Sequence, residues 1–180
     1  MSSKIEPVKL SFRIARATDA DEITELVQLA YRGGKATVDW KNESHLVEGP
    51  RINSDEVISI IQKEGSEILL VESDGKIIGC VKVEKLGDEA SIGLLAVNPD
   101  YQNIGLGRRL VQKAESFAIE EFYCKTASMT VLSGRDELLN WYLSLGYRLT
   151  GVSMAFECGL QRVKIENPHF REIRKPLVSV

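Results

Sequence analysis

The sequence has few cysteines, no long apolar run and no excess of basic residues. Its three cysteines, Cys80, Cys124 and Cys158, are odd in number and form no CxxC pair, so neither a disulfide framework nor a zinc site is predicted. We expect buried free thiols instead. No segment approaches the roughly 18 apolar residues of a membrane span, and the N-terminus lacks the apolar stretch of a signal peptide. These absences predict a cytoplasmic location and no membrane partner.

The charge distribution argues against a further class of partner. The formal net charge is -3 at pH 7, and the lysines and arginines are scattered along the chain. Such a chain has no long-range attraction to phosphate backbones, so we expect no nucleic-acid partner. His45 and His169 lack partners at a spacing typical of a metal site or a catalytic triad. No metal is therefore predicted.

The length and composition predict one domain. The 180 residues, of which 43% are hydrophobic and 27% charged, are enough to bury one core without stabilising disulfides or metal ions. We expect a single domain over residues 1–180, with a core over about 11–157 and a final strand over about 169–175.

Apolar periodicity and turn residues predict alternating strands and helices. The pair Asp74-Gly75 is a strong hairpin signal, and Asp19 followed by Glu22 resembles a capping box before the first helix, which Gly33 ends. The strand over 126–132 is expected to run parallel to the one over 90–97. The other predicted strands cover 11–17, 67–73, 76–86, 147–156 and 170–176, and later helices begin at about 54, 106 and 136.

The most informative segment covers residues 94–110, LLAVNPDYQNIGLGRRL, where a strand leads through a glycine-containing loop into a helix. Glycines let the backbone approach a bulky anion, and a helix N-terminus adds N–H donors and positive potential. The segment therefore predicts a phosphate site. It is no Walker A loop, because Arg108 and Arg109 follow Gly107, and no Rossmann fingerprint, because Leu110 stands where glycine or alanine is required.

The same segment resembles motif A of the GNAT N-acetyltransferases, in which a strand is followed by a Q/RxxGxG/A loop that opens a helix. A second resemblance lies in LLNWYLSLGYRLTG, residues 138–151, which is similar to the family's late NxxxLYxxLGF helix. Both motifs occur in the expected order, and the predicted strands and helices agree with the family across roughly residues 11–157.

The resemblance implies a mixed α/β fold with a mostly antiparallel central sheet flanked by helices. One parallel strand pair would splay apart to receive acetyl-CoA, whose pyrophosphate would bind the loop. Asn140 would contact the pantetheine arm, and Tyr142 would donate a proton to the leaving thiolate after direct attack by an amine. The remaining residues implied for the cofactor are Leu95, Ala96, Val97, Gln102, Asn103, Ile104, Gly105, Leu106, Gly107 and Arg108.

The general base is where the sequence departs from the family pattern. Many relatives carry a carboxylate early in the strand over 90–97, where this chain has Ser91. A primary amine has a pKa of about 10.4, so a group must remove its proton. Glu84 is our candidate, and Glu89, Glu43 or a chain of water molecules stay open as alternatives.

The polar segment over 35–53 is long for a connecting loop, which suggests a function. It resembles a WxxExxLxxGxR pattern found in a subset of GNAT-like proteins, and its residues Trp40, Glu43 and Arg51 are candidates for a wall of the acceptor pocket. Glu43 or Glu48 would hold an ammonium group. Arg51 would contact a carboxylate or fix the loop.

The leading hypothesis is an acyltransferase that moves acetyl from acetyl-CoA to a primary amine of a small molecule or peptide. The alternative is a non-catalytic acyl-CoA-binding sensor or interaction module of the same fold. Tyr142 favours the enzyme, whereas the missing carboxylate at Ser91 favours the sensor. A homodimer formed through the C-terminal strands is a possibility by analogy with the family.

Overall fold

The computed structural model describes residues 9–33, 41–157 and 161–177. Its α-helices are α1 (Ala20–Arg32), α2 (Ser54–Gln62), α3 (Leu106–Glu120) and α4 (Asp136–Ser144). Two short 3-10 turns, η1 (Ala17–Asp19) and η2 (Pro99–Tyr101), precede α1 and α3. The strands are β1 (Leu10–Ile14), β2 (Val47–Glu48), β3 (Ser66–Ser73), β4 (Lys76–Leu86), β5 (Glu89–Val97), β6 (Thr126–Leu132), β7 (Arg148–Ala155), β8 (Arg162–Val163) and β9 (His169–Pro176).

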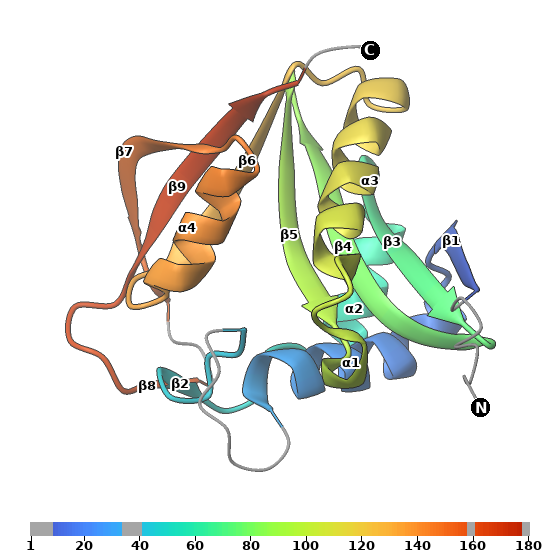
Figure 1. Cartoon of the computed structure of the whole chain (residues 1–180), viewed down its shortest axis with the longest axis horizontal. Helices are drawn as coiled ribbons and strands as arrows, with labels where there is room; N and C mark the ends of the chain where they lie inside the picture. Colours follow the sequence, from blue (N-terminus) through green and yellow to red (C-terminus); the bar gives the residue numbers. More distant parts are fainter. Residues whose placement is uncertain (1–8, 34–40, 158–160, 178–180) are drawn as a thin grey trace, which may run out of the picture.

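The strands form a seven-stranded sheet in the order β1-β3-β4-β5-β6-β9-β7, while β2 pairs with β8 in a separate ribbon. Neighbours in the sheet are antiparallel except β5 and β6, which are parallel. The β5–β6 pairing joins residues 89–91 to residues 126–128, and beyond these the two strands diverge (Figure 1). The expected fold class, including the splayed parallel pair, is confirmed.

A bulge in β5 sets which side chains face the opening. The register between β4 and β5 shifts between Cys80 and Lys82, so that β5 carries an extra residue there. Leu94, in this part of β5, has a φ of 48°, a left-handed conformation that costs a non-glycine residue about 1–2 kcal/mol. Because the extra residue reverses the alternation of side chains, Leu95 and Val97 pack on the same side as α3.

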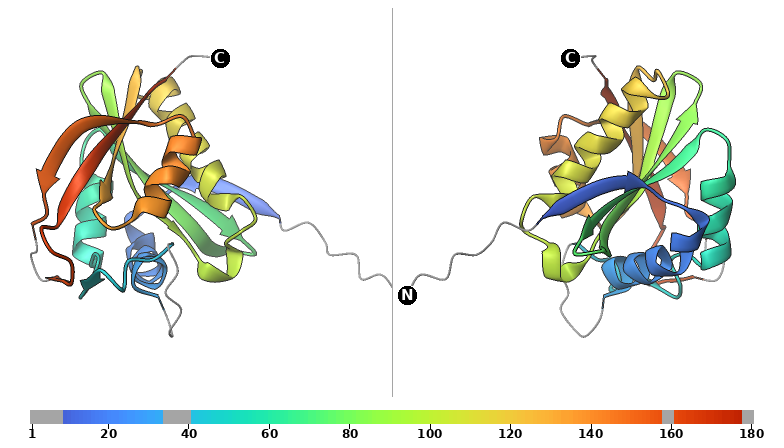
Figure 2. Two further views of the ribbon diagram at one scale, coloured as in Figure 1. Left: turned by 60° about the vertical axis from the view of Figure 1, so that its left-hand side comes forward. Right: turned by 90° about the vertical axis from the view of Figure 1, so that its right-hand side faces the viewer.

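Helices cover both faces of the sheet around β3, β4 and β5. Figure 2 shows α3 on one side of these strands and α2 on the other, with α1 beside α2. The core under α3 includes Leu106, Leu110, Ala114 and Ala118, and the core under α1 includes Ile23, Leu26, Val27 and Ala30. In both helices the apolar residues spaced three and four positions apart form the buried face.

Several local predictions are confirmed. Asp74 and Gly75 form the hairpin turn with φ values of 50° and 75°, and Gly33 ends α1 with a φ of 71°. Cys80 and Cys124 are buried free thiols, whereas Cys158 lies outside the described residues. Burial raises the pKa of the Cys80 thiol to about 12.

Two local predictions are wrong. The capping box before α1 does not form, because Arg13 donates to the carboxylate of Asp19 and Glu22 accepts the N–H of Ile77 on β4. The polar segment before α2 also holds β2, which the sequence pattern did not reveal. No helix within the three described ranges is long and apolar enough to cross a membrane.

Candidate active site

The loop between β5 and α3 presents a row of backbone N–H groups. Asn103 and Gly105 take left-handed conformations, with φ values of 67° and 77°, and turn the chain into the first turn of α3. Within the described part of the chain, no protein atom accepts a hydrogen bond from the N–H groups of residues 103–108. The next donor, Arg109 N–H, bonds to the carbonyl oxygen of Gly105 (3.1 Å). Unsatisfied donors at a helix N-terminus favour an anionic ligand.

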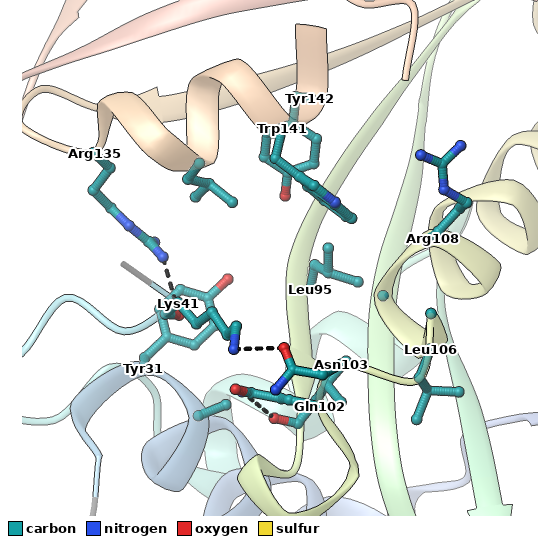
Figure 3. A pocket seen from close by; sticks show the side chains of 15 residues that line it. Tyr31, Lys41, Leu95, Gln102, Asn103, Leu106, Arg108, Arg135, Trp141 and Tyr142 are labelled. Carbon is teal, nitrogen blue, oxygen red and sulfur yellow. Dashed lines mark hydrogen bonds between the residues drawn. The ribbon is translucent and has the colours of Figure 1, made fainter. Parts of the chain in front are cut away.

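Two side-chain contacts hold this loop. The amide of Gln102 donates to the carbonyl oxygen of Val97 (3.2 Å), which ties the loop to the end of β5. Lys41 Nζ donates to Oδ1 of Asn103 (2.8 Å) and brings an ammonium group to the opposite side of the loop (Figure 3). The anion site therefore has a positive charge from a segment far away in sequence.

The two adjacent arginines of α3 point in different directions. Arg108 lines the pocket at the start of the helix. The guanidinium of Arg109 instead lies over the ring of Phe12 on β1, 5.4 Å from its centroid. Arg108 can therefore contribute its charge to an anion in this pocket, whereas Arg109 stabilises the packing of β1.

A first pocket, of about 240 Å³, extends from this loop along β5 to α4. Gly107 and Trp141 adjoin each other in its lining, since a Cβ added at Gly107 would lie 3.5 Å from the Trp141 ring. Its lining combines both motifs found in the sequence: Ala30, Tyr31, Lys41, Leu95, Val97, Gln102, Asn103, Gly105, Leu106, Gly107, Arg108, Arg135, Leu138, Trp141 and Tyr142. The residues of motif A and of the late helix thus meet in one site.

Tyr142 lies where α4 faces β5. Its side chain is buried, and its hydroxyl points into the pocket in Figure 3. Burial raises the pKa of this hydroxyl, and the nearby Tyr31 raises it further, while Arg135 opposes the shift. The phenol is consequently protonated at neutral pH and is able to donate its proton to a basic group formed in the pocket.

A second pocket, of about 220 Å³, lies on the other side of Tyr142 between the diverging strands. It shares Tyr31, Leu95, Arg135, Leu138 and Tyr142 with the first pocket. The further lining comes from β5, β6, β9 and the segments near β2 and β8: Glu43, Arg51, Ile92, Gly93, Leu94, Met129, Thr130, Val131, Leu132, Phe156, Glu157, Gln161 and Phe170. A ligand in each pocket would therefore meet the other at Tyr142 and Leu95.

Glu43 joins two arginines at the wall of the second pocket. Its carboxylate contacts Arg32 Nη1 at 2.5 Å and Arg135 Nη1 at 3.3 Å. All three side chains are at most 9% exposed. Because a buried charge needs a partner, Glu43 stabilises these arginines and is not available as a primary contact for an ammonium group.

The predicted cofactor residues are mostly brought together. Leu95, Val97, Gln102, Asn103, Gly105, Leu106, Gly107 and Arg108 all line the first pocket. Ala96 is buried on the α1 side of β5, while Ile104 and Asn140 are exposed and lie outside the lining. Of the predicted acceptor residues, Glu43 and Arg51 line the second pocket, and Trp40 lies outside the described residues.

Glu84 is not brought to the site. Its carboxylate is paired with Lys63 and with Lys82 (2.9 Å), and these hydrogen bonds lower its pKa. It lies opposite Ser91 in the sheet but lines neither pocket. Glu89, an alternative, accepts from Ser128 and pairs with Arg174. Both carboxylates are therefore positioned as structural ion-pair partners.

Sequence reasoning missed several residues that face the pockets. Leu138 and Trp141 lie with Tyr142 on one face of α4, and their spacing of three and four residues could have revealed them. Tyr31 and Arg135 had no local signal, since they lie at the end of α1 and directly before α4. Their role depends on the tertiary arrangement.

A helix N-terminus with unpaired N–H groups lies at the end of a splayed strand pair, and a second pocket lies beyond it, within the residues that the structure describes. The chain belongs to the acetyltransferase (GNAT) family, whose model matches residues 34–147.

Two curated relatives are named amino-acid acetyltransferases. The protein from Azotobacter vinelandii is 32% identical over 95 residues, which are 52% of this chain and 21% of that protein. The protein from Pseudomonas putida is 28% identical over the same share of each chain, 52% and 21%. The chain therefore spans about a fifth of the length of these relatives.

Solved structures share the fold over nearly the whole chain. The ribosomal-protein-S18-alanine N-acetyltransferase from Escherichia coli has a TM-score of 0.73 and 19% identity, with 96% of each chain covered. A spermidine N-acetyltransferase from Vibrio cholerae in complex with CoA and spermine has a TM-score of 0.67 and 16% identity, with 93% of this chain and 95% of that chain covered. At these identities the likeness concerns the fold.

Proposed function

We propose that the protein transfers the acetyl group of acetyl-CoA to an amine. The observation that carries this proposal is the row of N–H groups over residues 103–108, which has no protein acceptor within the described ranges and lies in the first pocket, which in turn adjoins the second. Family membership supports it, as do the names of the amino-acid acetyltransferases among the relatives. Acetyl-CoA supplies an activated thioester, whose acetyl group an amine accepts without an acyl-enzyme.

The residues of the first pocket fit this ligand. The N–H groups of residues 103–108 are proposed to bind the pyrophosphate, with Arg108 and Lys41 adding positive charge. Beyond residue 91 no strand of the described residues pairs with the side of β5 that faces β6, so its backbone is available to the amides of the pantetheine arm. The bulge at Leu94 turns Leu95 toward the reacting group.

Tyr142 is proposed as the acid. The amine nitrogen attacks the carbonyl carbon, the carbon–sulfur bond breaks, and the hydroxyl of Tyr142 gives its proton to the departing thiolate. A phenol in water has a pKa of about 10. Burial raises the pKa of Tyr142 above that value, which keeps the proton in place until the thiolate forms.

The proton of the acceptor ammonium needs a separate route. Of the carboxylates that line the second pocket, Glu43 is held by two arginines, whereas Glu157 is exposed at the pocket edge. We assign Glu157 the role of holding the ammonium group and passing its proton to solvent. Glu84 is not proposed as the base, because it lines neither pocket.

Pairing of two copies through β7 is proposed as the basis of a homodimer. β7 ends the order of the sheet, and its side chains Leu149, Val152 and Met154 are 52%, 49% and 38% exposed. An edge strand with exposed apolar side chains is suited to pairing with the same strand of a second copy. Light scattering of wild type and of Val152→Lys tests this.

A cytoplasmic location stays a prediction from the sequence.

A thiol-release assay tests the activity. Purified protein is given acetyl-CoA and a panel of polyamines, aminoglycosides, amino acids and short peptides, while thermal shift measures CoA binding. Thiol release that depends on one class of amine supports the proposal. A CoA-induced shift without thiol release from any amine would favour the binding module, and no shift would refute the anion site.

A further inference from the structure

The second pocket contains a guanidinium group that no carboxylate of the described residues neutralises. Arg51 lines this pocket, and among the residues that the structure describes no carboxylate lies within salt-bridge distance of its guanidinium. Arg32 and Arg135 differ from it, because both contact the carboxylate of Glu43. A guanidinium that stays charged in a pocket favours an anionic ligand group.

The position of Arg51 is fixed by its surroundings. Its backbone N–H donates to Oε1 of Gln28 on α1 (3.0 Å), and the carbonyl oxygen of Gly49 accepts from Arg32 Nε (2.7 Å). The guanidinium lies over the ring of Tyr31, 5.0 Å from its centroid. This cation–π contact leaves N–H groups of the guanidinium available for a carboxylate.

The charges around the pocket indicate what kind of molecule fits. The charged side chains around it are three arginines, Arg32, Arg51 and Arg135, and two glutamates, Glu43 and Glu157. Glu43 contacts two of the arginines, Arg32 and Arg135. Arg51 would repel a purely cationic amine. A molecule with a carboxylate at Arg51 and an ammonium group near Glu157 would match both ends.

We propose that the acceptor is a small amine that also carries a carboxylate and that Arg51 binds this carboxylate. The inference rests on the proposed function and adds the class of acceptor. Arg51 acts on specificity, since it orients the acceptor so that its nitrogen points toward the junction at Leu95 and Tyr142. Polyamines are correspondingly poor acceptors.

The test compares amines in pairs that differ in the carboxylate alone: L-methionine with L-methioninamide, L-lysine with cadaverine, and 4-aminobutyrate with butylamine. Wild type is expected to show a kcat/KM for the carboxylated member that is about 10- to 100-fold higher. Arg51→Gln should abolish this preference and leave kcat/KM for the amine without a carboxylate within about twofold of the wild-type value. Arg51→Lys should restore part of it.

The control variant is Arg16→Gln, which removes an exposed arginine directly before η1 and should leave every value unchanged. The methionine pair tests an amine next to the carboxylate, and the 4-aminobutyrate pair tests an amine at the far end of the molecule. Their comparison shows which of the two arrangements Arg51 selects. An equal loss for both members of a pair in Arg51→Gln, or a wild-type preference for the members without carboxylate, would overturn the assignment.

A binding measurement keeps this result separate from the activity. If no amine of the panel releases thiol, the proposed function has failed, and calorimetry with CoA-saturated protein decides about Arg51. Binding of L-methionine or 4-aminobutyrate that Arg51→Gln weakens about 10-fold or more supports the carboxylate site. Absent binding, or binding that the variant leaves unchanged, overturns it.

Discussion

Replacing Gly107 by alanine should move stability and CoA binding in opposite directions. Gly107 lies in the first turn of α3, and an added Cβ would lie 3.5 Å and 3.6 Å from two atoms of the Trp141 ring, which is ordinary contact. Alanine is favoured over glycine within a helix by about 1 kcal/mol at most, so the melting temperature should rise by up to about 2–4 °C.

CoA binding should weaken, because the methyl group occupies space between Gly107 and Trp141 in the lining of the first pocket, beside the N–H groups of residues 103–108. Displacing a phosphate from one charge-assisted hydrogen bond costs about 1.5–3 kcal/mol. This corresponds to a dissociation constant about 10- to 150-fold higher. Valine at this position should abolish binding, since its larger side chain must also displace Trp141.

Calorimetric titration with CoA and scanning calorimetry of the free protein measure the two effects. Gln112→Ala, an exposed change in the same helix, is the matched control and should keep the wild-type affinity. Wild-type affinity of a folded Gly107→Ala protein would refute the placement of the anion. A clear drop in melting temperature would refute the steric argument.

Three other changes test separate parts of the molecule. Tyr142→Phe should lower kcat in the thiol-release assay about 100-fold or more while calorimetry shows nearly unchanged CoA affinity, because it removes a proton donor needed as the thiolate forms. Glu43→Gln removes the carboxylate charge that contacts the buried Arg32 and Arg135 and should cost about 3–5 kcal/mol in urea denaturation. Hydrogen bonds from Arg13 lower the pKa of Asp19, so its stabilisation is present above the ordinary aspartate pKa of about 3.9 and is lost as pH falls through the lower folded value. Asp19→Asn should therefore flatten the acid side of the stability profile.

Local signals were sufficient for most of the fold. The hairpin at Asp74 and Gly75, the helix end at Gly33 and the apolar faces of α1 and α3 depend on residues within a few positions of each other. The failures involve long-range partners. Glu22 bonds to Ile77 on β4, and β2 forms by pairing with β8, more than a hundred residues later in the chain.

The site residues also fall into those with a local sequence signal and those without one. Motif A is one continuous segment, so residues 95–108 could be named from the sequence, and the resemblance added Tyr142 on the late helix. The bulge at Leu94 had no signal, because its residue type is usual for a strand and its left-handed φ follows from the pairing with β4. Without that bulge the motif would still be recognisable, but Leu95 would face α1.

Glu43 shows how partners that are distant in sequence decide what a predicted residue contacts. Its position beside a polar segment suggested a contact for the acceptor ammonium, and it does line the second pocket. Its two partners come from α1 and from the residue before α4, which is 92 positions away. Pairing with Arg32 and Arg135 converts Glu43 from a ligand contact into support for the junction. Among the described residues no carboxylate pairs with Arg51, so the charge of the acceptor should be read from Arg51 and not from Glu43.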